Sequence, residues 1–472
     1  MMGNPLIQRY RYSLLRPSHL LVYVTIYISV VLLLLFVNYA FYKHQDTFNS
    51  PQELCRGIYF QFLAFQIIIL WIWGGFSSAS AVKEEITGKT YDFFRMLPLA
   101  AHQKTVGILI GKNLVILLLT AINCLLLILS GSIGRLSVNL QSQIFLVLFS
   151  IAILINSIGL LSSINPNLKS KKTNALAIVA LVFLFGPFLF GSLGALSEIA
   201  KLEQVRAWFF AIELPVLILI SLVALYFSCW AIIGILRKFT REDEPLFTRK
   251  GALLFMLGFE LILLGLFYHY LGKAETETSY IYWIISLLAV LAVPFGAIRT
   301  FDKYLEYSGL FREKSGSNVN NFSRILLHSN ISLALGLFAI WTIGSIAIIL
   351  ISRMEFLRGL YWIWILFSFY LFLMLLLELN ILYKPVSAKI GLLLCFIAAV
   401  YAILPPILSA ILESDVLYLH SPVGFFWIMI DEPYTEIPSL ISVWVVNILL
   451  CLVPALLIRK RYSYIPKLRQ KM

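Results

Sequence analysis

The feature that most constrains this chain is a series of twelve apolar stretches, each about 19–23 residues long and nearly free of ionised side chains. A helix of that length crosses about 30 Å of hydrocarbon. Of the 472 residues, 60% are hydrophobic and 13% are charged, whereas soluble domains carry charge on about a quarter of their residues. We therefore expect an integral membrane protein, in which no remaining segment is long enough to fold as a soluble catalytic domain.

The predicted spans form two sets of six. They cover residues 20–42, 58–81, 113–133, 143–161, 175–194 and 214–236, and then 252–271, 280–298, 331–351, 360–380, 390–411 and 439–458. With both termini in the cytoplasm, most of the 37 lysines and arginines fall on the cytoplasmic side, as the positive-inside rule requires. Because these residues lie in short loops, the net charge of +13 indicates orientation in a plasma (bacterial inner) membrane and not nucleic-acid binding.

The two sets also match in the character of their loops. In each set the second and third spans are joined by the long cytoplasmic loop, and the fifth and sixth by the longest external loop: 82–112 and 299–330, and 195–213 and 412–438. The expected fold class is therefore an all-α polytopic membrane protein with twelve transmembrane helices in two parallel six-helix halves, residues 20–240 and 241–472. Loop 412–438 contains an apolar segment too short to span, which predicts a re-entrant hairpin or an aromatic anchor.

Residues 1–19 precede the first span and are expected to form an interfacial helix. Between Pro5 and His19, apolar residues alternate with Arg9, Arg11 and Arg16, a pattern typical of a segment that lies among lipid headgroups. The alternative is a basic flank that only fixes the topology.

Loop 82–112 contains the most informative pattern in the chain. Glu84 and Glu85 directly follow the second span, and Gly88 interrupts that helix. Thr90 can cap a new short helix, and Asp92 then lies in its first turn, where the helix dipole favours an anion.

One face of this short predicted helix is strongly apolar, which is unusual for a segment in water. Phe93 and Phe94 share it with Leu97, whereas Arg95 lies on the opposite face and Pro98 ends the segment. Two exposed phenylalanines require a groove on a partner or the membrane surface.

Motifs for enzymatic chemistry are incomplete. Gly88-Lys89-Thr90 lacks the earlier glycine of a phosphate-binding loop, because Lys83 stands at that position. The six histidines are far apart in the sequence and form no metal-binding pattern. We therefore expect no catalytic residue, no metal site and no cofactor on this chain.

One set of residues in loop 82–112 carries a resemblance to a known family: Glu85, Gly88, Thr90, Asp92, Leu97-Pro98-Leu99 and Gly111-Lys112. In order, spacing and topological position it resembles the first cytoplasmic loop of ATP-binding-cassette (ABC) exporter permeases of the second type. The chain departs from the family pattern at Lys89, which is inserted, and at Ala100, where serine is usual. Loop 299–330 lacks the proline and the Gly-Thr pair.

The resemblance implies a coupling helix that docks on a separate ABC ATPase subunit, which holds ATP and Mg²⁺ and rocks the two halves as it closes. The coupling residues that it implies are Glu84, Glu85, Gly88, Thr90, Asp92, Phe93, Phe94, Arg95 and Pro98. Among them Glu85, Phe93, Phe94 and Arg95 are the expected contacts. A membrane-surface helix that only clamps the loop is the alternative. The substrate, and whether a second permease chain completes the pathway, stay open.

Two carboxylates lie inside predicted spans. Glu260 falls near the middle of the seventh span, where a lone charge costs at least about 2.5 kcal/mol, and Glu378 lies near the cytoplasmic end of the tenth, where it can snorkel. Each is a candidate for a substrate or proton pathway, and a hydrogen-bonded packing role is the alternative. A secondary transporter of the major-facilitator kind and a non-transporting scaffold are the other functions considered.

Overall fold

The computed structural model describes most of the chain in two compact units. The described residues are 4–43, 50–88, 97–164, 205–241, 244–271, 276–297, 330–352, 356–383, 407, 411, 445, 448–449, 451–452 and 454–459. The first unit comprises Met1–Trp208 and Ile212–Leu246, and the second comprises Phe209–Ala211 and Phe247–Met472. Each unit has its own hydrophobic core.

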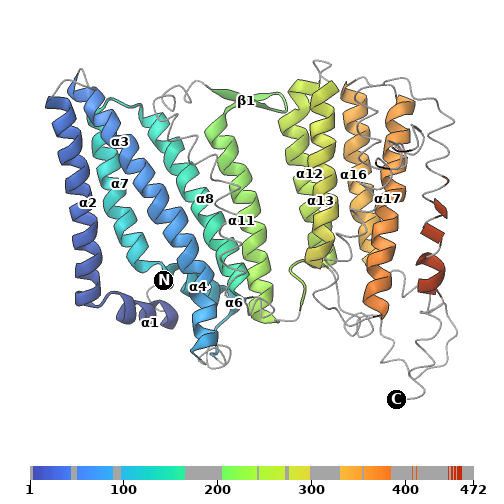
Figure 1. Ribbon diagram of the computed structural model, residues 1–472, viewed down its shortest axis with the longest axis horizontal. Coiled ribbons are helices and arrows are strands. Elements are labelled where there is room, and N and C mark those ends of the chain that lie inside the picture. The colour runs from blue at the N-terminus through green and yellow to red at the C-terminus, as the bar shows by residue number, and fades with distance from the viewer. Residues whose placement is uncertain are drawn as a thin grey trace. The chain divides into compact units, whose positions relative to one another are not determined.

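Helices make up almost all of the described first unit (Figure 1). In chain order they are α1 (Pro5–Leu14), α2 (Pro17–Lys43), α3 (Pro51–Ile67), the π-helix η1 (Ile68–Trp73), α4 (Gly74–Thr87), α6 (Ala101–Lys112), α7 (Leu114–Ile133), α8 (Val138–Ile164) and α11 (Val216–Thr240). A hairpin of β1 (Arg206–Phe209) and β2 (Ile212–Pro215) precedes α11.

The second predicted span is longer than expected, because α3, η1 and α4 continue from Pro51 to Thr87. Pro51 occupies the first helical position, and the Ser50 hydroxyl oxygen accepts a hydrogen bond from the Glu53 N–H at 3.2 Å. Within η1, the Trp71 indole N–H donates to the Leu148 carbonyl of α8 at 3.0 Å. Single π-helical turns of this kind often mark functional positions.

The second unit contains α12 (Arg249–Leu271), α13 (Thr276–Ala297), α16 (Asn330–Ser352) and α17 (Phe356–Tyr383). Its core is built around large aromatic side chains that are fully buried, namely Tyr282, Trp283, Trp341 and Tyr370. Pro294 lies inside α13, near the end of the helix.

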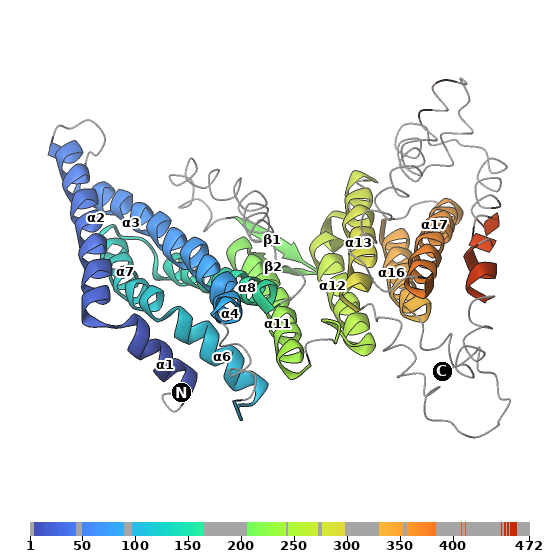
Figure 2. The same ribbon diagram turned by 60° about the horizontal axis from the view of Figure 1, so that its bottom comes forward.

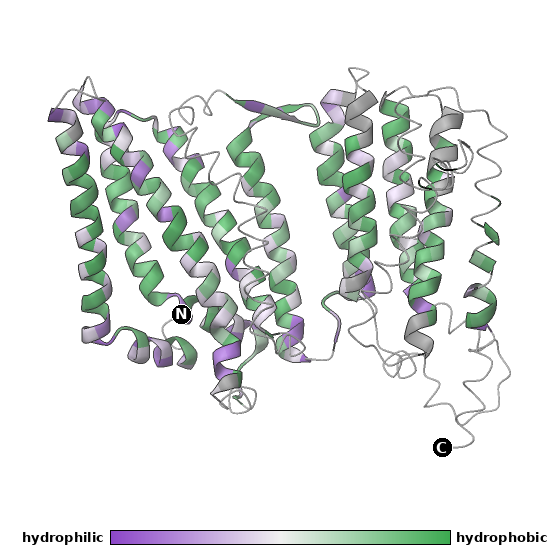
Figure 3. Ribbon diagram, viewed as in Figure 1, coloured by the Kyte–Doolittle hydropathy of each residue, from purple (hydrophilic) through white to green (hydrophobic). Residues whose placement is uncertain are grey.

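Among the described residues, seven helical segments are long and apolar enough to cross a membrane: Pro17–Ala40, Pro51–Ile86, Leu114–Ile133, Val138–Ile164, Val216–Thr240, Arg249–Tyr270 and Asn330–Ile351. Figure 3 shows hydrophobic residues along most of these helices, with hydrophilic residues at several of their ends and a few within them. The chain is thus an all-α polytopic membrane protein. Predicted span 175–194, loop 412–438 and all of loop 299–330 except Asn330 lie outside the described residues, and span 390–411 lies almost wholly outside them.

The N-terminal segment forms a helix, α1, that runs beside α6 (Figure 2). Leu6 and Tyr10 are 2% and 7% exposed and lie one turn apart on α1. They pack over Gly107 and Gly111, which are also one turn apart. The apolar face of α1 is therefore directed at protein and not at acyl chains, because two glycines on α6 let the helices approach closely.

Close approach and buried polar contacts also hold the membrane-spanning helices of the first unit together. A Cβ at Gly159 of α8 would lie 2.9 Å from the Gly75 carbonyl oxygen of α4, so only glycine fits there. Deeper in the unit, Tyr27 of α2 donates to Asn123 of α7 at 3.1 Å, and Asn123 donates to Gln66 of α3 at 2.8 Å. Such interhelical hydrogen bonds replace the hydrophobic driving force that is absent between helices in lipid.

Replacing Gly111 by leucine should displace α1 from α6, because even a Cβ at this position would lie 2.5 Å from Cδ2 of Tyr10. The contact is measured by bismaleimide crosslinking of Asn4→Cys to Gln103→Cys in a chain without its native cysteines, since Asn4 Nδ2 donates to the Gln103 carbonyl at 2.7 Å. We expect the crosslink to be largely lost. It should persist in the control Gly234→Ala, where the nearest atoms are 3.6 Å away. An unchanged yield in Gly111→Leu would contradict this packing.

Candidate functional site

The end of α4 is tied to two neighbouring elements by ion pairs. Glu84 pairs with Lys112 at the end of α6. Glu85 pairs with Arg9 of α1, whose Nη2 lies 3.0 Å from both carboxylate oxygens. These four residues, which we call the loop base, hold together the elements on either side of residues 89–96, which lie outside the described residues.

An apolar cluster lies behind the loop base and joins five helices. Its buried members are Leu6 of α1, Ala81 and Val82 of α4, Ile108 of α6, Leu160 and Ile164 of α8, and Ile235 of α11. Leu97 and Leu99, which flank Pro98, pack against it. Apolar contacts therefore anchor the segment that contains Leu97 and Leu99, directly before α6.

The electrostatic strength of the loop base is modest. Arg9 is 45% exposed and Glu84 is 57% exposed, and exposed ion pairs contribute about 0.2–1 kcal/mol each. Burial, followed by the nearby charge of Glu85, raises the pKa of Tyr10, so that this phenol stays neutral beside the carboxylate. The pairs therefore fix the direction of α4 more than they stabilise the fold.

Asn113 interrupts the helix between α6 and α7, one residue after Lys112. Its Nδ2 donates to the Leu109 carbonyl at 2.9 Å. This side-chain bond replaces the backbone hydrogen bond that the Leu109 carbonyl would accept in an uninterrupted helix. Nδ2 also donates to Ser78 Oγ of α4 at 3.0 Å, and Ser78 donates to Asn156 Oδ1 of α8 at 2.7 Å. This polar triad of Asn113, Ser78 and Asn156 links the α6–α7 bend to α4 and α8.

Asn113→Ala should lower the free energy of unfolding by about 1–3 kcal/mol, because it leaves buried hydrogen-bonding groups without their partner. The effect is measured by unfolding the purified chain in mixed micelles. The control is Ser132→Ala, at an exposed position of α7 where the hydroxyl donates to the Ile128 carbonyl of the same helix, and it should change stability much less. Equal effects of the two substitutions would show that the triad does not stabilise the bend.

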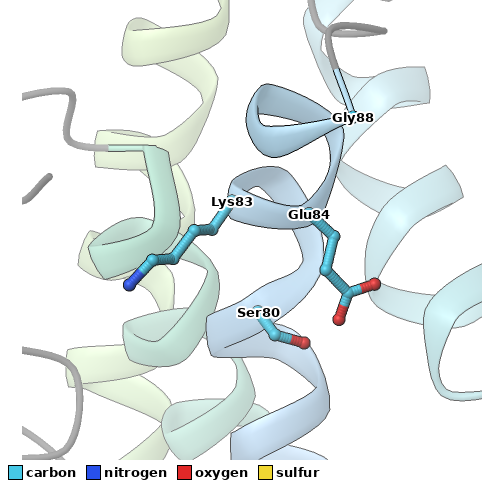
Figure 4. A pocket seen from close by; sticks show the side chains of 4 residues that line it. All are labelled: Ser80, Lys83, Glu84 and Gly88. Atoms are coloured by element: carbon cyan, nitrogen blue, oxygen red, sulfur yellow. The ribbon is translucent and has the colours of Figure 1, made fainter. Parts of the chain in front are cut away.

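A surface pocket of about 400 Å³ runs along the last two turns of α4 and is lined by Ser80, Lys83, Glu84 and Gly88. Figure 4 shows Lys83 and Glu84 directed to opposite sides of the helix. A second pocket, of about 410 Å³, lies between the N-terminal ends of α1 and α6 and includes His102 and Gln103. Among the described residues, no three His, Cys, Asp or Glu side chains gather as a metal site.

The described part of the chain contains four of the predicted coupling residues. Glu84 and Glu85 are engaged in ion pairs within the chain, α4 ends at Thr87 with Gly88 as its C-cap, and Pro98 lies on the resumed chain. The other predicted coupling residues, Thr90, Asp92, Phe93, Phe94 and Arg95, lie outside the described residues. The partners Arg9 and Lys112 were not predicted, although two adjacent acidic residues at one helix end are a signal for such pairs.

Glu260 of α12 is 3% exposed and lies where three helices meet. Its carboxylate accepts hydrogen bonds from the hydroxyls of Tyr282 and Ser286, both on α13. A Cβ at Gly344 of α16 would lie 2.6 Å from the Tyr282 hydroxyl oxygen and 3.1 Å from Glu260 Oε2. This close packing favours the structural interpretation of Glu260, and its role in a substrate or proton pathway stays a prediction.

Glu378 of α17 does not snorkel toward water, so that part of the prediction is wrong. It is 2% exposed, and Asn330 of α16 donates to its Oε2 at 3.0 Å. The physical reason is that α16 begins at Asn330, beside Glu378, and supplies an amide donor that the sequence separation of 48 residues concealed.

Glu260→Leu should destabilise the second unit by at least about 1–3 kcal/mol, because Tyr282 and Ser286 would lose their buried acceptor. Glu260→Gln keeps an acceptor oxygen and should cost less. Unfolding in mixed micelles measures both, with Glu213→Leu at an exposed position of β2 as the control. Wild-type stability in Glu260→Leu would remove the structural role.

Comparison with protein-family models, with curated proteins and with solved structures finds no match to this chain. The candidate site therefore rests on the chain's own geometry and on the residues of loop 82–112.

Proposed function

We propose that this chain is the membrane-spanning permease subunit of an ABC exporter, which moves a substrate outward when a separate ATPase subunit docks on loop 82–112 and hydrolyses ATP. The observation that carries the proposal is the loop base. Ion pairs from α4 to α1 and α6 brace both described ends of the loop in which the exporter-like residues occur. A loop that receives force from a partner needs attachment at both ends, and these pairs together with the apolar cluster behind them provide it.

We also propose the number of membrane-spanning helices, their division into halves and the orientation of the chain. Twelve transmembrane helices form two parallel six-helix halves in a plasma (bacterial inner) membrane, with both termini in the cytoplasm. Cations at the loop-base end of the first unit support this orientation under the positive-inside rule: Arg9, Lys83, Lys112, Arg237 and Lys238. ATP and Mg²⁺ bind to the partner ATPase, and whether a second permease chain completes the pathway stays an open question.

Replacing both Phe93 and Phe94 by serine should abolish co-purification of the ATPase, because the predicted docking face would lose its apolar contacts. Membrane insertion should be unchanged, since the substitutions lie outside the seven candidate spans. Co-purification from native membranes, followed by assay of ATP hydrolysis, measures the effect. The control is Tyr39→Ser, at a residue that is 60% exposed and lies near the C-terminal end of α2. Full recovery of the ATPase with the double variant would contradict the docking site.

A secondary, ion-coupled transporter is the second candidate, and the buried Glu260 favours it, because intramembrane carboxylates often carry protons. Proteoliposomes that contain this chain alone separate the two functions. Uptake driven by a proton gradient, and lost in Glu260→Gln, would support the second candidate and exclude the first.

A further inference from the structure

The helix α1 has an outer face that is distinct from the face that packs on α6. Leu6 and Tyr10 are buried against α6, whereas Gln8, Arg11 and Tyr12 are exposed. These three positions are spaced i, i+3, i+4 and therefore share one side of the helix. Tyr12 is 77% exposed, and Arg16, which is also exposed, follows at the start of the next segment.

Among the described residues, neither Arg11 on this face nor Arg16 just beyond α1 has a carboxylate partner. Arg9 is paired with Glu85, but Arg11 and Arg16 form no ion pair with any described residue. The first acidic residue of the sequence is Asp46, so no carboxylate in the preceding segment can neutralise them. Within the described part of the chain, the outer face of α1 and Arg16 beside it therefore carry an uncompensated positive charge that attracts anions.

The surface beside this face is suited to acyl chains. The helix α2 begins at Pro17, and its first turns expose Leu21, Val22 and Ile26 by 67%, 53% and 58%. At 1.5 Å per residue, Leu21 lies about 7.5 Å along the chain from Arg16, so that a cation and an exposed apolar side chain are close together at the start of α2. Tyr12 adds an aromatic side chain of the kind enriched at membrane–water interfaces.

We propose that Arg11 and Tyr12 on the outer face of α1, together with Arg16 between α1 and α2, bind the phosphate-bearing headgroups of anionic phospholipids. Charge complementarity selects an anion, and continuity with the lipid-exposed side of α2 selects a lipid over a soluble anion. Because Arg9 on the same helix holds Glu85 in the loop base, bound lipid also stabilises the position of α4. This inference does not depend on the exporter function.

The test uses the full chain in neutral detergent, titrated with phosphatidylglycerol that carries a fluorescent tail. An arginine near an anionic surface contributes about a fivefold gain in affinity, so Arg11→Gln/Arg16→Gln should weaken binding about 25-fold. The matched control Arg135→Gln/Arg206→Gln removes two exposed arginines elsewhere in the first unit and should leave binding unchanged. Arg11→Lys/Arg16→Lys keeps the charge and should retain most of the affinity, which separates loss of charge from loss of fold.

Three results would overturn the proposal. The first is equal weakening by the control pair, and the second is equally tight binding of phosphatidylcholine with the same tail. The third is displacement of the labelled lipid by millimolar inorganic phosphate, which would indicate a soluble-anion site. Retention of phosphatidylglycerol by the wild type but not by the glutamine variant in native mass spectrometry would support it independently.

Discussion

The structure depends on one constraint of the bilayer: helices surrounded by hydrocarbon gain little from the hydrophobic effect when they pack together. Their association therefore relies on close backbone approach and on interhelical hydrogen bonds, which contribute about 0.6–2 kcal/mol each. The first unit uses both, at Gly75 and Gly159 and at the contact of Tyr27 with Asn123. The second unit uses the same means where Gly344 packs over the hydrogen-bonded Glu260.

At the loop base, ion pairs and apolar contacts connect α1, α4, α6, α8 and α11. α4 is held to α1 by Glu85 and to α6 by Glu84, and the apolar cluster behind these pairs includes α8 and α11. One residue beyond Lys112, the triad of Asn113 links the same α4 to the α6–α7 bend. A force applied at loop 82–112 would thus reach four membrane-spanning elements through direct contacts, which is the mechanical requirement of the proposed exporter.

The sequence predicted the membrane class and the approximate positions of most described helices, because hydropathy over about 20 residues reports the bilayer directly. It placed the start of the second span at 58 and overlooked Ser50-Pro51, a capping signal that begins α3. Hydropathy cannot reveal η1, because a π-helical turn changes backbone bonding and not composition. The partners of Glu85 and Glu378 could not be predicted, since Arg9 and Asn330 are brought to them only by tertiary packing.

The most direct measurement places a photo-crosslinking amino acid, benzoylphenylalanine, at position 94 of the full chain in native membranes and identifies the adducts by mass spectrometry. The account predicts a protein adduct whose purified complex with this chain hydrolyses ATP. Adducts with lipid alone, at yields matching those from a probe at the lipid-exposed Leu32, would contradict a docking role for loop 82–112.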